Sequence, residues 1–108
     1  MSKKEKFKVA YCAQYGGFGL SREAVKRIKE IDDSYEKWDD YDFGYKIPRH
    51  DPALIQAIEE LGLEVASGPH CTLEIEEISG RTYRINEYDG NESVETPEND
   101  HLSWTVIG

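Results

Sequence analysis

Residues 51–62 read DPALIQAIEELG and contain the signals of a helix with a defined beginning and end. Asp51 can accept hydrogen bonds from the first free backbone amides, and Pro52 suits the first helical position because it has no amide to leave unpaired. Gly62 supplies the positive φ angle that commonly ends a helix. Apolar side chains recur at helical spacing and form one stripe, namely Leu54, Ala57, Ile58 and Leu61. The stretch therefore predicts an amphipathic helix that must pack on another apolar surface.

A strand and another helix are predicted before this stretch. Residues 7–12 (FKVAYC) indicate a strand with two apolar faces, because Val9 and Tyr11 alternate with Ala10 and Cys12. A glycine-rich turn follows, and Ser21 is typical of a helix-capping residue. The helix after it is predicted from apolar residues at helical spacing and a basic opposite face, with Ala24, Ile28 and Ile31 on one side and Arg22, Lys26 and Lys29 on the other.

Residues 71–88 predict a β-hairpin, because two alternating segments flank a Ser-Gly turn. A loop of three residues sets Leu73 opposite Ile85 and places Gly80 at a left-handed position, whereas a two-residue loop would put the apolar sets on opposite faces. The first register leaves one apolar face and one solvated face, which carries Glu74, Glu76 and Arg84.

The remaining segments complete the predicted architecture. Residues 32–46 combine acidic and aromatic side chains and indicate a packed loop whose rings cover the edge of the core. A short strand is expected around Val94, and residues 102–106 alternate as a last strand. The order β-α-α-β-β, with a possible further strand, predicts one α+β domain over residues 1–108. Its two helices would pack on one face of a small, largely antiparallel sheet.

Charge and composition limit the function classes. The net charge is −9, and residues 1–30 hold 8 Lys or Arg against 3 Asp or Glu, whereas residues 31–108 hold 5 against 19. An acidic surface of this size repels phosphate backbones, which argues against general nucleic-acid binding. No apolar run approaches the ~20 residues that cross a bilayer, and the charged residues 1–6 lack the apolar region typical of a signal peptide, so we expect none. Two distant cysteines, Cys12 and Cys71, favour buried reduced thiols in a cytoplasmic protein.

Two helix starts could form a site for an anionic ligand. The loop formed by Tyr15, Gly16, Gly17 and Phe18 precedes the first helix, where backbone amides and the helix dipole attract anions. Arg49 and His50 precede the second helix and would add a guanidinium and an imidazole. Tyr88, Asp89 and Trp104 complete the candidate binding residues, with the two rings as stacking walls. The alternative is that these residues have only structural roles, with the glycine-rich loop forming a tight turn and Arg49 and His50 simply preceding a helix.

Catalytic and metal-binding signatures are weak. Glu87 and Asp89 could act with His50 in acid–base chemistry, but an Asp-Gly turn explains the acidic pair equally well. The three histidines lack zinc-site spacing, and no calcium-loop, nucleotide or nucleophile motif occurs. We therefore expect no metal ion and no cofactor.

Taken together, the motifs resemble a family of small uncharacterised proteins found in bacteriophages, large DNA viruses and some bacteria. The resemblance rests on YGGFGLS (15–21), RHDPALIQAIEELG (49–62), SG with CTLEIEEI (67–78), INEYDG followed by ESV (85–94), and HLSW (101–104). It implies a phage or viral setting and expression in host cytoplasm, but no established activity.

The sequence favours a non-enzymatic acidic binding protein that docks on a host protein. We expect its acidic surface to include Asp39, Asp40, Asp42, Glu92 and Glu95. The alternative is a protein that binds a nucleotide or other small anion, or a small enzyme, using the Tyr15–Gly19 loop with Arg49 and His50. Neither hypothesis requires a membrane.

Overall fold

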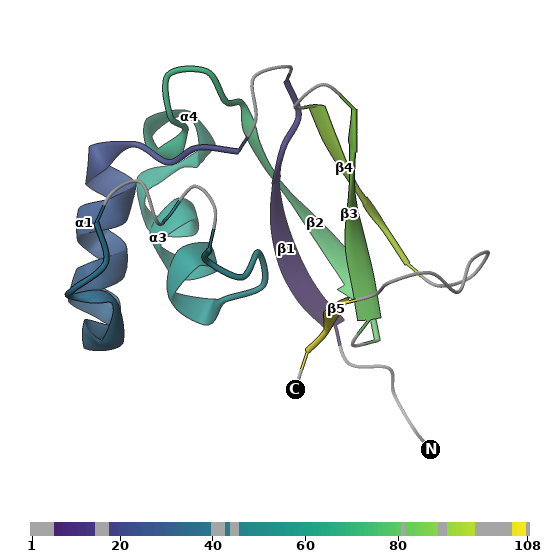
Figure 1. Cartoon of the computed structure of the whole chain (residues 1–108), viewed down its shortest axis with the longest axis horizontal. Helices are drawn as coiled ribbons and strands as arrows, with labels where there is room; N and C mark the ends of the chain where they lie inside the picture. Colours follow the sequence, from purple (N-terminus) through teal and green to yellow (C-terminus); the bar gives the residue numbers. More distant parts are fainter. Residues whose placement is uncertain are drawn as a thin grey trace.

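The computed structural model describes residues 6–14, 18–39, 43, 46–80, 82–88, 91–96 and 105–107. Within them the chain runs in the order β1 (Lys6–Cys12), α1 (Arg22–Ile31), the 3₁₀ helix η1 (Asp33–Tyr35), α3 (Pro52–Leu61), α4 (Leu63–Ala66), β2 (Leu73–Ser79), β3 (Thr82–Tyr88), β4 (Asn91–Glu95) and β5 (Thr105–Val106). Figure 1 shows the helices on one side of β1 and β2, with β3 and β4 on the other. The predicted α+β class is confirmed.

The two predicted helices begin and end where their capping residues place them. Ser21 Oγ accepts a hydrogen bond from Ala24 N at 3.1 Å, and Asp51 Oδ1 accepts from Ala53 N at 2.8 Å. Gly62 ends α3 with a φ angle of 91°, which a residue with a side chain adopts only under strain. These local signals act without help from distant residues, so the sequence predicts them well.

The main core lies between the helices and one face of the two-stranded sheet. β1 and β2 pair antiparallel, with Ala10 opposite Ile75 and Cys12 opposite Leu73. Directly opposite residues share a face, and these four side chains belong to the cluster that includes α1 and α3. The fully buried members of this cluster with the largest side chains are Phe43, Ile28, Leu54, Ile58, Leu73 and Cys12.

The predicted β-hairpin between residues 71 and 88 is wrong. β2 pairs with β1, whereas β3 pairs with β4 on one side and with β5 on the other. Gly80 has the predicted positive φ angle of 88°, so the turn exists, but it connects two sheets. The pairing differs because the second face of β1 is also apolar and must be covered. Val9 is buried there against Ile78, Tyr83 and Ile107.

The face predicted to be solvated is therefore only partly so. Glu76 is exposed and Glu74 is half-buried, but the second apolar cluster occupies much of the same sheet face. Arg84 does not lie opposite Glu74; its guanidinium contacts Glu95 of β4 at 2.7 Å. The expected strand around Val94 is β4, while the described part of the last predicted strand is limited to β5.

The acidic–aromatic segment packs as predicted where it is described. Tyr35 and Phe43 are buried, and Trp38 packs between them, with ring centroids 4.6 Å from Tyr35 and 5.3 Å from Phe43. The Tyr35 hydroxyl donates to Asp51, the cap of α3. This contact connects η1 to the start of the second helix.

Across the described ranges, every helix is too short or too polar to traverse a lipid bilayer.

Asp51→Ala should destabilise the protein more than Ser21→Ala. Each change removes a helix cap, which costs about 1 kcal/mol, but Asp51 caps two amides and also accepts from the half-buried Tyr35 hydroxyl. We expect losses of about 2 and about 1 kcal/mol in the free energy of unfolding, measured by urea denaturation. Equal losses would show that the Tyr35 contact contributes nothing.

Candidate functional site

Arg49, one of the predicted anion-binding residues, is held by a carboxylate of this chain. Its Nη1 lies 2.6 Å from Glu92 Oε1 and its Nη2 lies 3.0 Å from Glu92 Oε2, which is a bidentate ion pair. The two side chains are only 19% and 7% exposed. Glu92 was expected on the acidic surface, and that expectation is wrong because the carboxylate is buried to pair with Arg49.

The same two residues complete the hydrogen bonding of β1. Glu92 Oε1 also accepts from Cys12 N at 2.8 Å, and the carbonyl of Arg49 accepts from Ala10 N at 2.8 Å. These amides point away from β2, so Ala10 and Cys12, on the edge of β1 opposite β2, have acceptors without a neighbouring strand. Arg49 and Glu92 therefore connect the segment before α3, β1 and β4.

Phe18 lies against Arg49, as the predicted site requires, but the contact is internal. The guanidinium carbon is 3.7 Å from the centroid of the Phe18 ring, a cation–π geometry. With a ring on its face and a carboxylate at its edge, the guanidinium has both of its usual recognition modes occupied. A small anion would therefore compete with Glu92 for the Nη1 and Nη2 donors.

His50 is also engaged. Its Nδ1 lies 2.7 Å from the hydroxyl oxygen of Tyr83, and the two rings meet edge to face. Burial lowers the pKa of His50, with the charge of Asp51 opposing that shift, and burial raises the pKa of Tyr83. The imidazole is therefore neutral at pH 7 and adds no positive charge for an anion.

The other predicted binding residues are not gathered by the described structure. Tyr88 is 77% exposed at the end of β3. Tyr15, Gly16, Gly17, Asp89 and Trp104 lie outside the described residues. Their part in an anion site stays a prediction, whereas Phe18, Arg49 and His50 have structural partners.

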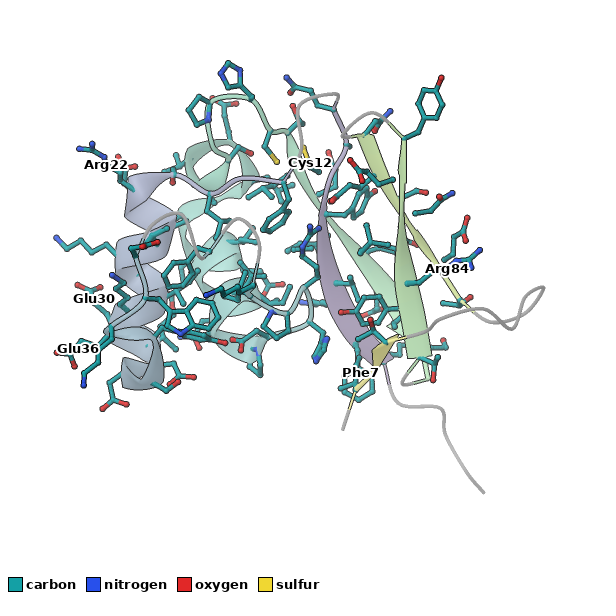
Figure 2. The ribbon with its side chains drawn as sticks, in the orientation of Figure 1. Phe7, Cys12, Arg22, Glu30, Glu36 and Arg84 are labelled. Atoms are coloured by element: carbon teal, nitrogen blue, oxygen red, sulfur yellow. The ribbon has the colours of Figure 1, made fainter. Side chains whose placement is uncertain are left out.

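The two cysteines are buried and unbridged, as predicted. Cys12 ends β1, where Figure 2 labels it, and its Sγ lies 3.5 Å from the carbonyl oxygen of Gln14. Burial, followed by a hydrogen bond with the Cys12 thiol, raises the pKa of Cys71 to about 12. Neither thiol is placed as a nucleophile.

The sequence did not predict a pair of neighbouring hollows where α4 meets β2. One hollow there, of about 480 Å³, is lined by Leu63, Glu64, Ser67, Gly68, Cys71, Thr72, Leu73 and Glu74. A second, of about 330 Å³, is lined by Ile58, Glu59, Gly62, Leu63, Glu74 and Ile75. The two share Leu63 and Glu74, so we treat them as one feature, the α4–β2 groove. Its described lining contains three carboxylates and no cationic side chain.

Apolar side chains extend the α4–β2 groove onto the surface. Leu63 is 39% exposed and Val65 is 51% exposed, both on α4. The sequence signal for this element is short: Leu-Glu-Val-Ala directly after the Gly62 helix end. Four residues are too few for helical periodicity to be recognised, which is why the groove was missed.

A third hollow, of about 470 Å³, lies beside the start of α3 and includes His50. Its charges are mutually neutralised, because Lys8 pairs with Glu59 and Lys6 lies 3.9 Å from Glu77. Within the described ranges, no three metal-ligating side chains gather into a cluster.

Comparison with protein families, with curated proteins and with solved structures finds no match for this chain. The resemblance to small phage-type proteins stays a prediction.

Arg49→Ala should destabilise the protein by about 3 kcal/mol or more, because it leaves the Glu92 carboxylate buried without a counter-charge. The matched control is Arg27→Ala, which removes an exposed guanidinium from Glu60 and should have a much smaller effect. Urea denaturation measures both. A fully stable Arg49→Ala variant would contradict the structural role and return Arg49 to the anion-site hypothesis.

Cys71 should resist alkylation in the folded protein. With a pKa of about 12, almost no thiolate exists at pH 8, and the side chain is buried. Iodoacetamide labelling, followed by peptide mass spectrometry, should be slow in buffer and at least about tenfold faster in urea. Labelling at equal rates would show that the thiol is open to solvent.

Proposed function

We propose that this protein is a non-enzymatic accessory protein of phage type that acts in the host cytoplasm by docking on a host protein. Its docking surface is the α4–β2 groove with the acidic residues around it. The observation that carries this proposal is the groove itself, which combines an exposed apolar side chain, Leu63, with two carboxylates, Glu64 and Glu74, that no described cation neutralises.

The charge pattern supports a basic partner. Glu64, Glu74 and Glu76 make no ion pair with any described residue, whereas Glu59, Glu60, Glu92 and Glu95 each have a Lys or Arg partner. The negative charges of Glu76 and Glu74 also contribute to raising the pKa of Tyr11, after the larger effect of burial. Unpaired carboxylates closer together than the Debye length of ~8 Å act jointly on an approaching cation.

The apolar part of the groove supports a protein partner over a simple counter-ion. Leu63 is exposed and lines both hollows, and Ile58, Leu73 and Ile75 line one or other of them; Val65 of the same helix is also exposed. Apolar area at the centre with charges at the rim is the usual anatomy of a protein interface. Charge complementarity would then set the partner and the association rate.

The alternative function, binding of a small anion, depends mainly on the Arg49 guanidinium, which is already engaged within this chain. Arg49 is paired with Glu92 and covered by Phe18, and His50 is neutral and bonded to Tyr83. An anion bound elsewhere would face a protein of net charge −9. The alternative keeps one distinctive consequence, a ligand retained through purification.

Reversing groove charges should remove partner binding. We expect the amount of partner that co-purifies from host-like cytosol to fall at least about tenfold in the double variant Glu64→Lys with Glu74→Lys. The reason is that two attractive charge contacts become repulsive, which weakens the binding free energy by about 1.4 kcal/mol or more. The matched control reverses Glu23 and Glu36, which are exposed residues of α1 and its C-terminal side. Figure 2 shows Glu36 beside α1, on the opposite side of the helices from the sheets. Quantitative mass spectrometry of the co-purified proteins measures the result.

Equal loss in both variants would show that only net charge matters and would reject the groove as the docking surface. Native mass spectrometry of the wild type tests the alternative directly. A small-molecule adduct in place of a protein partner would favour the anion site, above all if Arg49→Ala removed it.

A further inference from the structure

The hydrogen-bond pattern of the first sheet fixes which backbone groups of β2 point outward. Ala13 N donates to Thr72 O at 2.8 Å, so odd-numbered residues of β1 bond to even-numbered residues of β2. Ala10 N and Cys12 N point the other way, toward Arg49 and Glu92. By the antiparallel register, the amides and carbonyls of Leu73, Ile75 and Glu77 therefore point away from β1.

That outer edge of β2 is only partly covered. Leu73 N donates to Ser67 Oγ at 2.9 Å, so the end nearest α4 is satisfied. The backbone groups of Ile75 and Glu77 have no hydrogen-bond partner among the described residues, because β2 belongs to a sheet with β1 alone. An edge with unpaired amides and carbonyls is a template for an added strand.

The two faces beside this edge differ in chemistry. On the face toward the helices, Ile58, Leu63 and Ile75 line the smaller hollow of the groove. On the other face, Glu74 and Glu76 lie beside Tyr11. Successive side chains of an added strand would project alternately to these two faces. Apolar residues would meet the hollow, and basic residues would meet the carboxylates.

We propose that the outer edge of β2 at residues 75–77 takes an extended segment of a partner protein, with alternating basic and apolar residues, as an additional strand. The inference rests on the proposed docking function and specifies its mode. A second copy of this chain fits poorly, because two β2 edges would place Glu74, Glu76 and Glu77 against their equivalents. The glutamates of β2, which reads Leu-Glu-Ile-Glu-Glu-Ile-Ser, protect the edge against like-charged strands but favour a basic one.

The test uses a fluorescein-labelled, terminally blocked octapeptide of alternating lysine and valine. Fluorescence anisotropy measures its affinity for the full chain, and NMR hydrogen exchange reports the amides of Ile75 and Glu77. A second peptide carries N-methyl groups on alternate residues, which removes the strand hydrogen bonds and keeps the charge. We expect N-methylation to weaken binding at least about tenfold and the unmodified peptide to protect both amides.

A protein variant tests the same edge from the other side. Glu77→Pro removes an outward amide without breaking a bond to β1, a position where edge strands tolerate proline. This variant should bind the unmodified peptide with an affinity at least about tenfold lower than that of the wild type. If this variant fails to fold, the N-methylated peptide still decides the question on the wild-type chain.

The outcomes separate this inference from the proposed function. Equal binding of the two peptides, with loss in the Glu64→Lys and Glu74→Lys variant, would overturn strand addition and keep acidic docking. Peptide binding that is unaffected by those reversals would overturn both. Strand addition would be rejected if the unmodified peptide did not bind. It would also be rejected if, without peptide, protection of the two amides rose with protein concentration, because that result would indicate pairing between copies of this chain.

Discussion

The bidentate ion pair of Arg49 and Glu92 is the contact on which the rest of the structure depends. It joins the segment before α3 to β4, and it supplies the acceptors for two amides at the edge of β1. Removing two charges from water is costly, so such a pair persists only with good geometry and additional bonds. Here two short N–H···O contacts, the Cys12 amide and the Phe18 ring provide them.

The ion pair also explains why β2 is left as the open strand. β1 has both faces buried. One face packs against the helices, and on the other Val9 packs against Tyr83 of β3, Ile78 and Ile107. Its edge opposite β2 is closed by Arg49 and Glu92, so the sheet does not continue there by ordinary strand pairing. The edge of β2 at residues 75–77 has no such acceptors among the described residues, so a further strand could join there.

Features that depend on neighbours in sequence were predictable, and features that depend on distant partners were not. The caps at Ser21 and Asp51, the end of α3 at Gly62 and the two-faced strand at residues 7–12 follow from local chemistry. The predicted hairpin is wrong because the alternation of apolar and polar residues in 73–79 fits pairing with β3 or with β1 equally well. Nothing in the sequence indicates the second pairing, since β1 is more than 60 residues away. The prediction that Glu92 lies on the acidic surface was wrong for the same reason, because nothing in residues 91–95 indicates that Arg49 will lie beside it.

In the folded protein, the described basic residues of the first 30 positions pair with only some of the acidic residues that follow them in sequence. Basic residues are concentrated in the first 30 positions, and three of those described pair with acidic residues of the later part of the chain: Lys8 with Glu59, Arg27 with Glu60, and Lys6 near Glu77. Glu64, Glu74 and Glu76 have no ion pair with a described residue. Unneutralised negative charge therefore lies beside α4 and the outer edge of β2. Arg49 and His50, in contrast, are bonded to Glu92 and Tyr83, so the carboxylates beside β2 are more accessible to a partner than these two side chains.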